Sequence, residues 1–258
     1  MSRATQAADS ILGRYFDAVV AHLTALRDTS GDAVARAAEL VAQKVMADEL
    51  VYVYGPGGHS NLATQEVFFR AGGLANISAI LDEGTLLSSG AMRSMAMERT
   101  LGYATVVMND NGLRAGDLLI LVNAYGINTA LIEAARWCRD TGVTTIGVSS
   151  KIHAEDTAAD HPARHPNGGN LHDLVDVHVD TQVPIGDAML SIDNVGERTS
   201  AVSTFANAYA MNSIMATAIT LVADSGGDPS IWRSGNAPGG DAHMTTFLHR
   251  FRGRVRWL

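Results

Sequence analysis

Residues 50–60 read LVYVYGPGGHS, a short apolar run that ends in a turn of glycine, proline, histidine and serine. Similar apolar runs alternate with helical patterns along the chain, at residues 76–80, 104–108, 118–122, 143–148 and 174–179. Strands that are apolar throughout and separated by helices are typical of a parallel sheet covered on both faces. The sequence therefore predicts a doubly wound α/β fold with a mainly parallel sheet.

Helical patterns flank these runs. Apolar residues recur every three or four positions over residues 11–26 and 34–45, which predicts two amphipathic helices, and a longer helix is expected over 199–222. Residues 150–170 are rich in His, Pro, Gly and Asp without a period and predict a long loop. We expect one structural unit with three parts: an N-terminal helical extension (1–48), an α/β domain (49–230) and a C-terminal arm (231–258).

Composition narrows the class of protein. The 258 residues carry a formal charge of −8, which argues against nucleic acid as a partner. No apolar run reaches the ~18 residues of a membrane span and no basic-then-apolar leader is visible, so we expect a cytoplasmic protein that does not enter a membrane. The single Cys138 is expected to be a buried core residue in a reducing compartment. The arginines at 250, 252, 254 and 256 are expected to form a solvated edge or a docked arm rather than a nucleic-acid site.

Polar and glycine residues follow three of the predicted strands. In open parallel sheets, ligands bind beyond the carboxyl ends of the strands, so these turns are the candidate ligand loops. The candidate contacts are Gly57, Gly58 and Ser60 in the first loop, Asn123, Tyr125 and Asn128 in the second, and Ser149 and Ser150 in the third. Glycines let the backbone approach a ligand, but the GxGxxG spacing of a dinucleotide site is missing. The loops predict a polyhydroxylated or anionic ligand and no bound cofactor.

The segment GPGGHSNLATQEVFFRAGGL (residues 55–74) resembles the first ligand loop and helix of SIS (sugar isomerase) domain proteins. In particular it is similar to an uncharacterised bacterial family related to the phosphosugar isomerases. The similarity continues through RHPNGGNLHDLVDVHVDT (164–181), PIGDAML (184–190) and SGNAPGGDAHM (234–244), and so extends over nearly the whole chain. The resemblance implies a five-stranded sheet flanked by helices, a homodimer or homotetramer, and a sugar-phosphate site at the strand ends near a subunit interface.

The second loop departs from the family. SIS relatives usually present hydroxyl groups there, as in SNSGRN, whereas this chain reads NAYGIN at 123–128. Tyr125 replaces a serine and Ile127 replaces a frequent arginine, so charge-assisted donors for a phosphate are lost. A sugar phosphate, an unphosphorylated sugar and a sugar with another anionic group therefore all stay open as ligands.

Candidates for acid/base chemistry are two glutamates and two histidines. Glu66 lies in the helix after the first loop, in the region where the resemblance implies a catalytic glutamate, and Glu83 is the alternative. His59, inside the first loop, and His243, in the glycine-rich C-terminal segment with Asp241, are candidates for the acid and for substrate contacts. His161 and His165 have the spacing of helical metal ligands, but prolines follow both of them, so we expect no metal site.

These residues predict an enzyme that interconverts the aldose and ketose forms of a sugar or sugar phosphate through an enediol, with Glu66 as base. A lyase, etherase or deaminase acting on an amino-sugar phosphate is one alternative. A non-catalytic sugar sensor is another, because SIS domains also serve regulatory proteins.

Overall fold

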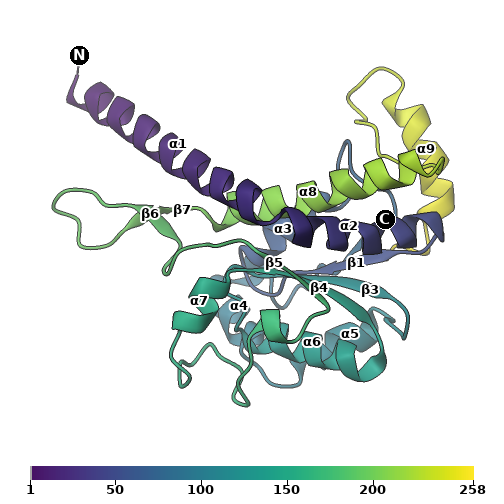
Figure 1. The fold of residues 1–258 in the computed structure, drawn as a ribbon, viewed down its shortest axis with the longest axis horizontal. Helices are drawn as coiled ribbons and strands as arrows, with labels where there is room; N and C mark the ends of the chain where they lie inside the picture. Colours follow the sequence, from purple (N-terminus) through teal and green to yellow (C-terminus); the bar gives the residue numbers. More distant parts are fainter. Residues whose placement is uncertain (1) are drawn as a thin grey trace.

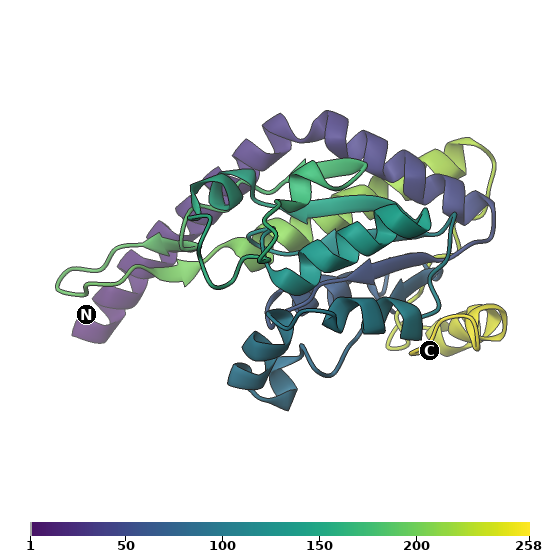
Figure 2. The ribbon, with the colours of Figure 1, turned by 90° about the horizontal axis from the view of Figure 1, so that it is seen from below.

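A computed structural model describes residues 2–258, and its centre is a five-stranded parallel sheet in the order β2-β1-β3-β4-β5. The strands are β1 (Val51–Tyr54), β2 (Ile77–Ala79), β3 (Leu118–Val122), β4 (Thr144–Ser149) and β5 (Val177–Asp180). A separate antiparallel pair is formed by β6 (Ala188–Leu190) and β7 (Thr199–Ala201). Five of the six predicted apolar runs are strands, and the predicted doubly wound sheet is confirmed (Figure 2).

Both faces of the sheet are covered by helices, as the apolar strands require. Successive side chains of a strand point to opposite faces. Val53 and Ile120 accordingly belong to a core with α2 (Gly31–Met46), α3 (Ser60–Val67) and α8 (Ser203–Asp224), while Tyr54 and Leu119 belong to a core with α5 (Tyr103–Asp110) and α6 (Thr129–Thr141). Figure 1 shows α2 and α8 above the sheet and α5 and α6 below it.

The predicted strand at 104–108 is wrong, because these residues form the helix α5. Ala104, Val107 and Met108 are buried whereas Val106 is 64% exposed, which is the spacing of a helix that buries one face. A run of five apolar residues cannot distinguish a strand from such a helix. Cys138 in α6 is buried as expected, and burial raises the pKa of its thiol to about 12.

The remaining helices shape the loops around the sheet. They are α1 (Arg3–Thr29), α4 (Ala91–Glu98), α7 (Lys151–Asp156) and α9 (Gly240–Phe251), with short 3-10 helices at Leu87–Ser89 and Leu171–Asp173. The predicted loop at 150–170 thus begins with a helix, and the predicted helix at 199–222 begins with strand β7. By length and composition α8 could cross a membrane, yet it packs here against α2 and α3.

The two ends of the chain lie at opposite ends of the molecule. The first half of α1 projects from the body beside the β6-β7 hairpin, which it contacts through the Tyr15 hydroxyl and the Ala201 carbonyl (Figure 1). The C-terminal arm instead docks on the body, because Arg250 and Arg254 both bind Asp48 and Arg256 binds Asp110. The N-terminal helices also differ from each other, since α2 covers the sheet while the start of α1 projects.

Candidate functional site

The loops after β1 and β3 meet at the carboxyl edge of the sheet. The chain leaves β1 toward β2 and returns to β3 on the other side, so the strand order reverses between β1 and β3, where open α/β sheets bind ligands. The side-chain amide of Asn123 donates to Oγ of Ser60 at 3.0 Å and to the Pro56 carbonyl at 3.4 Å. We call loops 55–60 and 123–128 together the strand-end site.

Glu98 lies against the first loop of this site. Gly57 has φ +99°, in the left-handed region, and a Cβ atom there would collide with Oε2 of Glu98. Glu98 ends α4 in the long connection between β2 and β3, and Leu87 of the same connection would meet a Cβ atom at Gly58. The backbone angle at Gly57 favours glycine, and a carboxylate oxygen lies where a larger residue would place its Cβ atom.

The carboxyl group of Glu98 has the properties of a general base. Burial raises its pKa from 4.5 to about 7, and the neighbouring Arg99 only partly opposes this shift. The carboxylate of Glu98 makes no hydrogen bond or ion pair within residues 2–258. A carboxylate with a pKa close to the working pH is suited to take up and return a proton. No sequence pattern points to Glu98, because this residue lies on a short helix outside the loop motifs and only the fold brings it to Gly57.

The second loop is organised around Asn123. Its Oδ1 atom accepts the backbone amides of Tyr125 and Gly126, both at 2.9 Å. The half-buried Tyr125 ring stacks on His153 with the ring centroids 3.7 Å apart. Oδ1 of Asn128 is buried and has no partner among the described residues. The ring of Tyr125 is thus held by His153, and Asn123 holds the loop in its conformation.

The serines of the third loop lie in the interior. Ser149 is fully buried and its Oγ lies 3.0 Å from Nε2 of His178, while the buried Ser150 donates to the Val183 carbonyl at 2.7 Å. Burial lowers the pKa of His178 from 6.5 to about 4, so this histidine is neutral near pH 7. Ser149 and Ser150, the two predicted ligand contacts of this loop, are engaged in hydrogen bonds inside the protein and stabilise the loops there.

His59 and Glu66 have different surroundings although both follow β1 closely. His59 is exposed and caps the start of α3 with its backbone, and its side chain makes no hydrogen bond in the part of the chain that the structure describes. Glu66 is held by Nδ2 of Asn212 in α8 at 3.2 Å and lies 3.5 Å from Nε of Arg70. His59 is available to a ligand at the first loop, whereas the carboxylate of Glu66 is engaged between α3 and α8.

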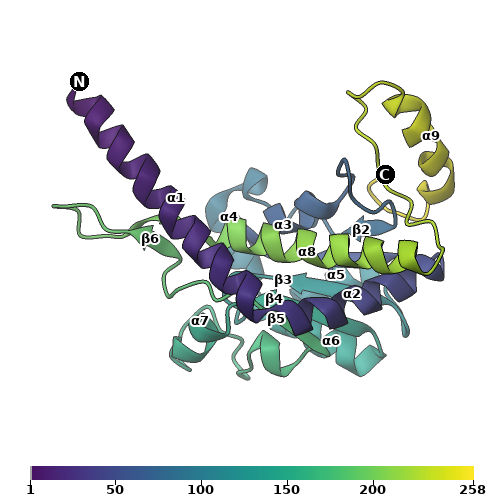
Figure 3. The ribbon, with the colours of Figure 1, turned by 45° about the horizontal axis from the view of Figure 1, so that its top comes forward.

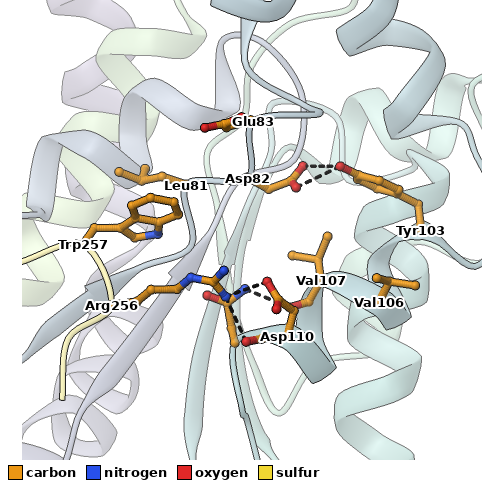
Figure 4. Close-up of a pocket in the computed structure, with 10 residues that line it drawn as sticks. Leu81, Asp82, Glu83, Tyr103, Val106, Val107, Asp110, Arg256 and Trp257 are labelled. Carbon is orange, nitrogen blue, oxygen red and sulfur yellow. Dashed lines mark hydrogen bonds and ion pairs between the residues drawn. The ribbon is translucent and has the colours of Figure 1, made fainter. Parts of the chain in front are cut away.

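Glu83 lines a different pocket of about 400 Å³ (Figure 4). The charged groups of this pocket are largely paired, because Asp82 accepts the Tyr103 hydroxyl at 2.8 Å and Asp110 binds Arg256 at 2.6 Å. Trp257 and Val106 form its apolar wall. None of the residues that line this pocket belongs to the strand-end site.

His243 and Asp241 lie in α9, at the amino-terminal edge of the sheet of the same protomer. His243 contacts the Ile231 carbonyl at 3.0 Å, and Ile231 is bridged to Leu74, which precedes β2. Figure 3 shows α9 at the end of the molecule away from α7, which follows β4. A protomer therefore does not bring these two residues to its own strand-end site. No cluster of three or more potential metal ligands is found in residues 2–258.

Comparisons with known proteins agree with this architecture. The model of the SIS domain matches residues 14–150. A UPF0309 protein of Brucella anthropi is 36% identical over 244 residues, covering 95% of this chain and 97% of that protein. A UPF0309 protein of Halalkalibacterium halodurans is 34% identical over 244 residues, covering 95% of this chain and 96% of that protein.

Among solved structures, a phosphoheptose isomerase of Neisseria gonorrhoeae superposes with a TM-score of 0.55 at 16% identity, covering 82% of this chain and 98% of that one. A phosphoheptose isomerase of Francisella tularensis superposes with a TM-score of 0.52 at 12% identity, covering 85% of this chain and 100% of that one. These likenesses concern the fold. Together with the sequence relatives they show that this chain belongs to the SIS domain family, within the group of UPF0309 proteins.

Proposed function

We propose that this protein is a cytoplasmic, homo-oligomeric isomerase that interconverts the aldose and ketose forms of a sugar or sugar phosphate at the strand-end site. The observation that carries the proposal is the Glu98 carboxyl group, with a pKa of about 7, lying against the glycine of a ligand-type loop. Membership in the SIS domain family and the fold shared with phosphoheptose isomerases support a sugar ligand.

Glu98 replaces Glu66 as the base in this proposal. The carboxylate of Glu98 removes the proton from the carbon next to the carbonyl group, which leaves an enediolate. The same carboxyl group then returns the proton to the adjacent carbon, so that the carbonyl moves by one position and no atom is lost. In this proposal the imidazole of His59, which is exposed two residues after Gly57, moves a proton between the two oxygens.

The first loop supplies donors for the negative oxygen of the intermediate. The backbone amides of Gly58, His59 and Ser60 have no acceptor among residues 2–258, and they lie at the N-terminus of α3. Unpaired amides at a helix start favour a developing negative charge. Glu98 and these amides therefore combine proton transfer with stabilisation of the enediolate.

The test is hydrogen exchange in deuterated water with a panel of free sugars and sugar phosphates, followed by NMR. We expect deuterium at the carbon next to the carbonyl group of at least one sugar. Glu98→Gln should reduce the rate at least about 100-fold, the usual contribution of a general base. Glu66→Gln is the matched control and should retain most activity. Binding without exchange would indicate a sensor, and loss of activity in Glu66→Gln alone would return the role of base to Glu66.

A further inference from the structure

The pocket of about 400 Å³ that contains Glu83 lies outside the strand-end site (Figure 4). Segments far apart in the sequence form it, because Asp82 and Glu83 follow β2 whereas Arg256 and Trp257 belong to the C-terminal arm. The docked arm is held there by the bond of Arg256 to Asp110 at 2.6 Å. Small-molecule sites in proteins have volumes of this order. We call this hollow the arm pocket.

The side walls of the arm pocket are apolar. Figure 4 shows Leu81 and the indole of Trp257 on one side of the pocket and Val106 and Val107 on the other. Trp257 and Val106 are exposed to solvent. The guanidinium of Arg256 lies 5.4 Å from the centre of the Trp257 ring, a cation–π contact that helps to fix the indole. Large apolar side chains gathered around one hollow indicate contact with a ligand.

The charge of the arm pocket is negative. The described residues that line it include three carboxylates, those of Asp82, Glu83 and Asp110, and one cation, Arg256. Arg256 is already neutralised, because it binds both Oδ2 and the main-chain carbonyl of Asp110. The lining therefore offers no free cation to an anionic ligand.

Asp82 and Glu83 form no ion pair among residues 2–258. Asp82 accepts two neutral donors, the Tyr103 hydroxyl at 2.8 Å and the backbone amide of Thr85 at 3.1 Å. Burial and the bond to Asp82 raise the pKa of Tyr103, so the phenol keeps its proton and does not neutralise the carboxylate. Glu83 is exposed, and its carboxylate makes no hydrogen bond in the same residues. Arg93 also influences Tyr103, but it is exposed on α4 and does not line the pocket.

We infer that the arm pocket binds a small organic cation, a protonated amine carried on an apolar ring or chain. Its ammonium group donates to Asp82 and Glu83, because hydrogen bonds between charged groups are stronger than neutral ones. Its apolar part packs against Leu81 and Trp257, and the face of the indole adds attraction for a positive charge. This site is separate from the strand-end site, and the inference does not depend on the proposed isomerase reaction.

Three ring compounds of similar size and different charge test the inference: cyclohexylamine, cyclohexanol and cyclohexanecarboxylate. NMR of the full chain at neutral pH and constant ionic strength follows the indole N–H signals of its three tryptophans, and Trp257→Phe identifies the signal of Trp257. We expect cyclohexylamine to shift this signal and to bind at least about tenfold more tightly than cyclohexanol, the effect of one charged hydrogen bond. Equal binding of amine and alcohol, tighter binding of the carboxylate, or no shift at ~10 mM amine would overturn the inference.

Calorimetry with variants assigns the binding to the arm pocket. Glu83→Gln alters an exposed side chain and should weaken binding of cyclohexylamine about threefold, the effect of one exposed ion pair, without changing that of cyclohexanol. Glu197→Gln, between β6 and β7, removes the same charge outside the pocket and is the matched control. Trp257→Ala should weaken binding of both compounds, because the apolar wall is lost. Equal effects of Glu83→Gln and Glu197→Gln, or unchanged binding in Trp257→Ala, would reject this site.

Discussion

Nδ2 of Asn123 donates a 3.0 Å hydrogen bond to Oγ of Ser60, and this contact joins the loops that follow β1 and β3. The other end of the same amide accepts two backbone N–H groups of its own loop. A single buried side chain thus sets the conformation of one loop and its distance from the next. Because both loops contribute to the strand-end site, Asn123 determines the shape of the site without being required to touch a ligand.

Asn123→Ala should lower the free energy of unfolding by about 2 kcal/mol, because two amides lose their acceptor in a buried position. Ser60→Ala removes only one hydrogen bond and should cost about 1 kcal/mol. Urea denaturation of both variants measures the difference. Equal losses would mean that the bonds from Asn123 to its own loop contribute nothing to stability.

Gly57→Ala should destabilise the protein more than Gly72→Ala. Both glycines have positive φ angles, +99° and +84°, so both substitutions strain the backbone by about 1–2 kcal/mol. A Cβ atom at Gly72 meets nothing within 4 Å, whereas one at Gly57 meets Glu98. Thermal denaturation should show the larger loss for Gly57→Ala, and adding Glu98→Ala should recover part of it. A double variant without recovery would contradict the close contact of Gly57 and Glu98.

The sequence predicts the sheet because most of its strands are short, largely apolar runs that end in a polar or glycine-rich turn. It failed at residues 104–108, where a short apolar run fits a helix equally well. It named the loops of the strand-end site but could not distinguish Ser60, which faces the second loop, from Ser149, which lies in the core. Burial of Ser149 depends on the pairing of β4 with β5, which brings His178 to it and which local sequence does not encode.

Glu98 could not be found from the sequence for a related reason. A glutamate at the end of a short helix has no distinctive neighbours, and its contact with Gly57 depends on how the connection between β2 and β3 folds back. Glu66 lies close to the first loop in the sequence, which favours it as the base, although Asn212 and Arg70 bind its carboxylate in the structure. Sequence proximity to a loop is a weaker guide than the path of the chain in space.

Glu98 should make stability fall as the pH rises. Its pKa is raised from 4.5 to about 7 in the folded state, so between these values the folded protein holds a proton that the unfolded chain has released. The free energy of unfolding therefore decreases from pH 4.5 to pH 7, by about 3 kcal/mol at most from this group. Glu98→Gln should remove this decrease in urea titrations at a series of pH values. An unchanged pH profile would show that Glu98 titrates normally.

His178 should make stability fall as the pH falls. Its pKa is lowered from 6.5 to about 4 by burial, so the unfolded chain takes up a proton first as the pH falls. Stability is full above pH 6.5 and is lost toward pH 4. His178→Gln should flatten this acid limb, since a glutamine amide can still bond with Ser149 but does not titrate in this range. NMR titration of the imidazole provides a direct check, and a normal pKa there would refute the burial argument.

The projecting half of α1 should be an interface between protomers. Tyr15 and Val19 pack on the body, but Leu12, Phe16 and Val20 form a second apolar stripe at helical spacing that is 70%, 67% and 44% exposed. A helix that is apolar on two faces indicates a further partner, and symmetric self-association is the commonest arrangement.

We expect light scattering at micromolar concentration to show a dimer or tetramer. The double substitution Leu12→Glu and Phe16→Glu should shift the protein toward the monomer with little loss of secondary structure. Met92→Glu, at a 72% exposed position on α4, is the matched control and should leave the mass unchanged. A wild-type protein that is monomeric under these conditions would reject the interface.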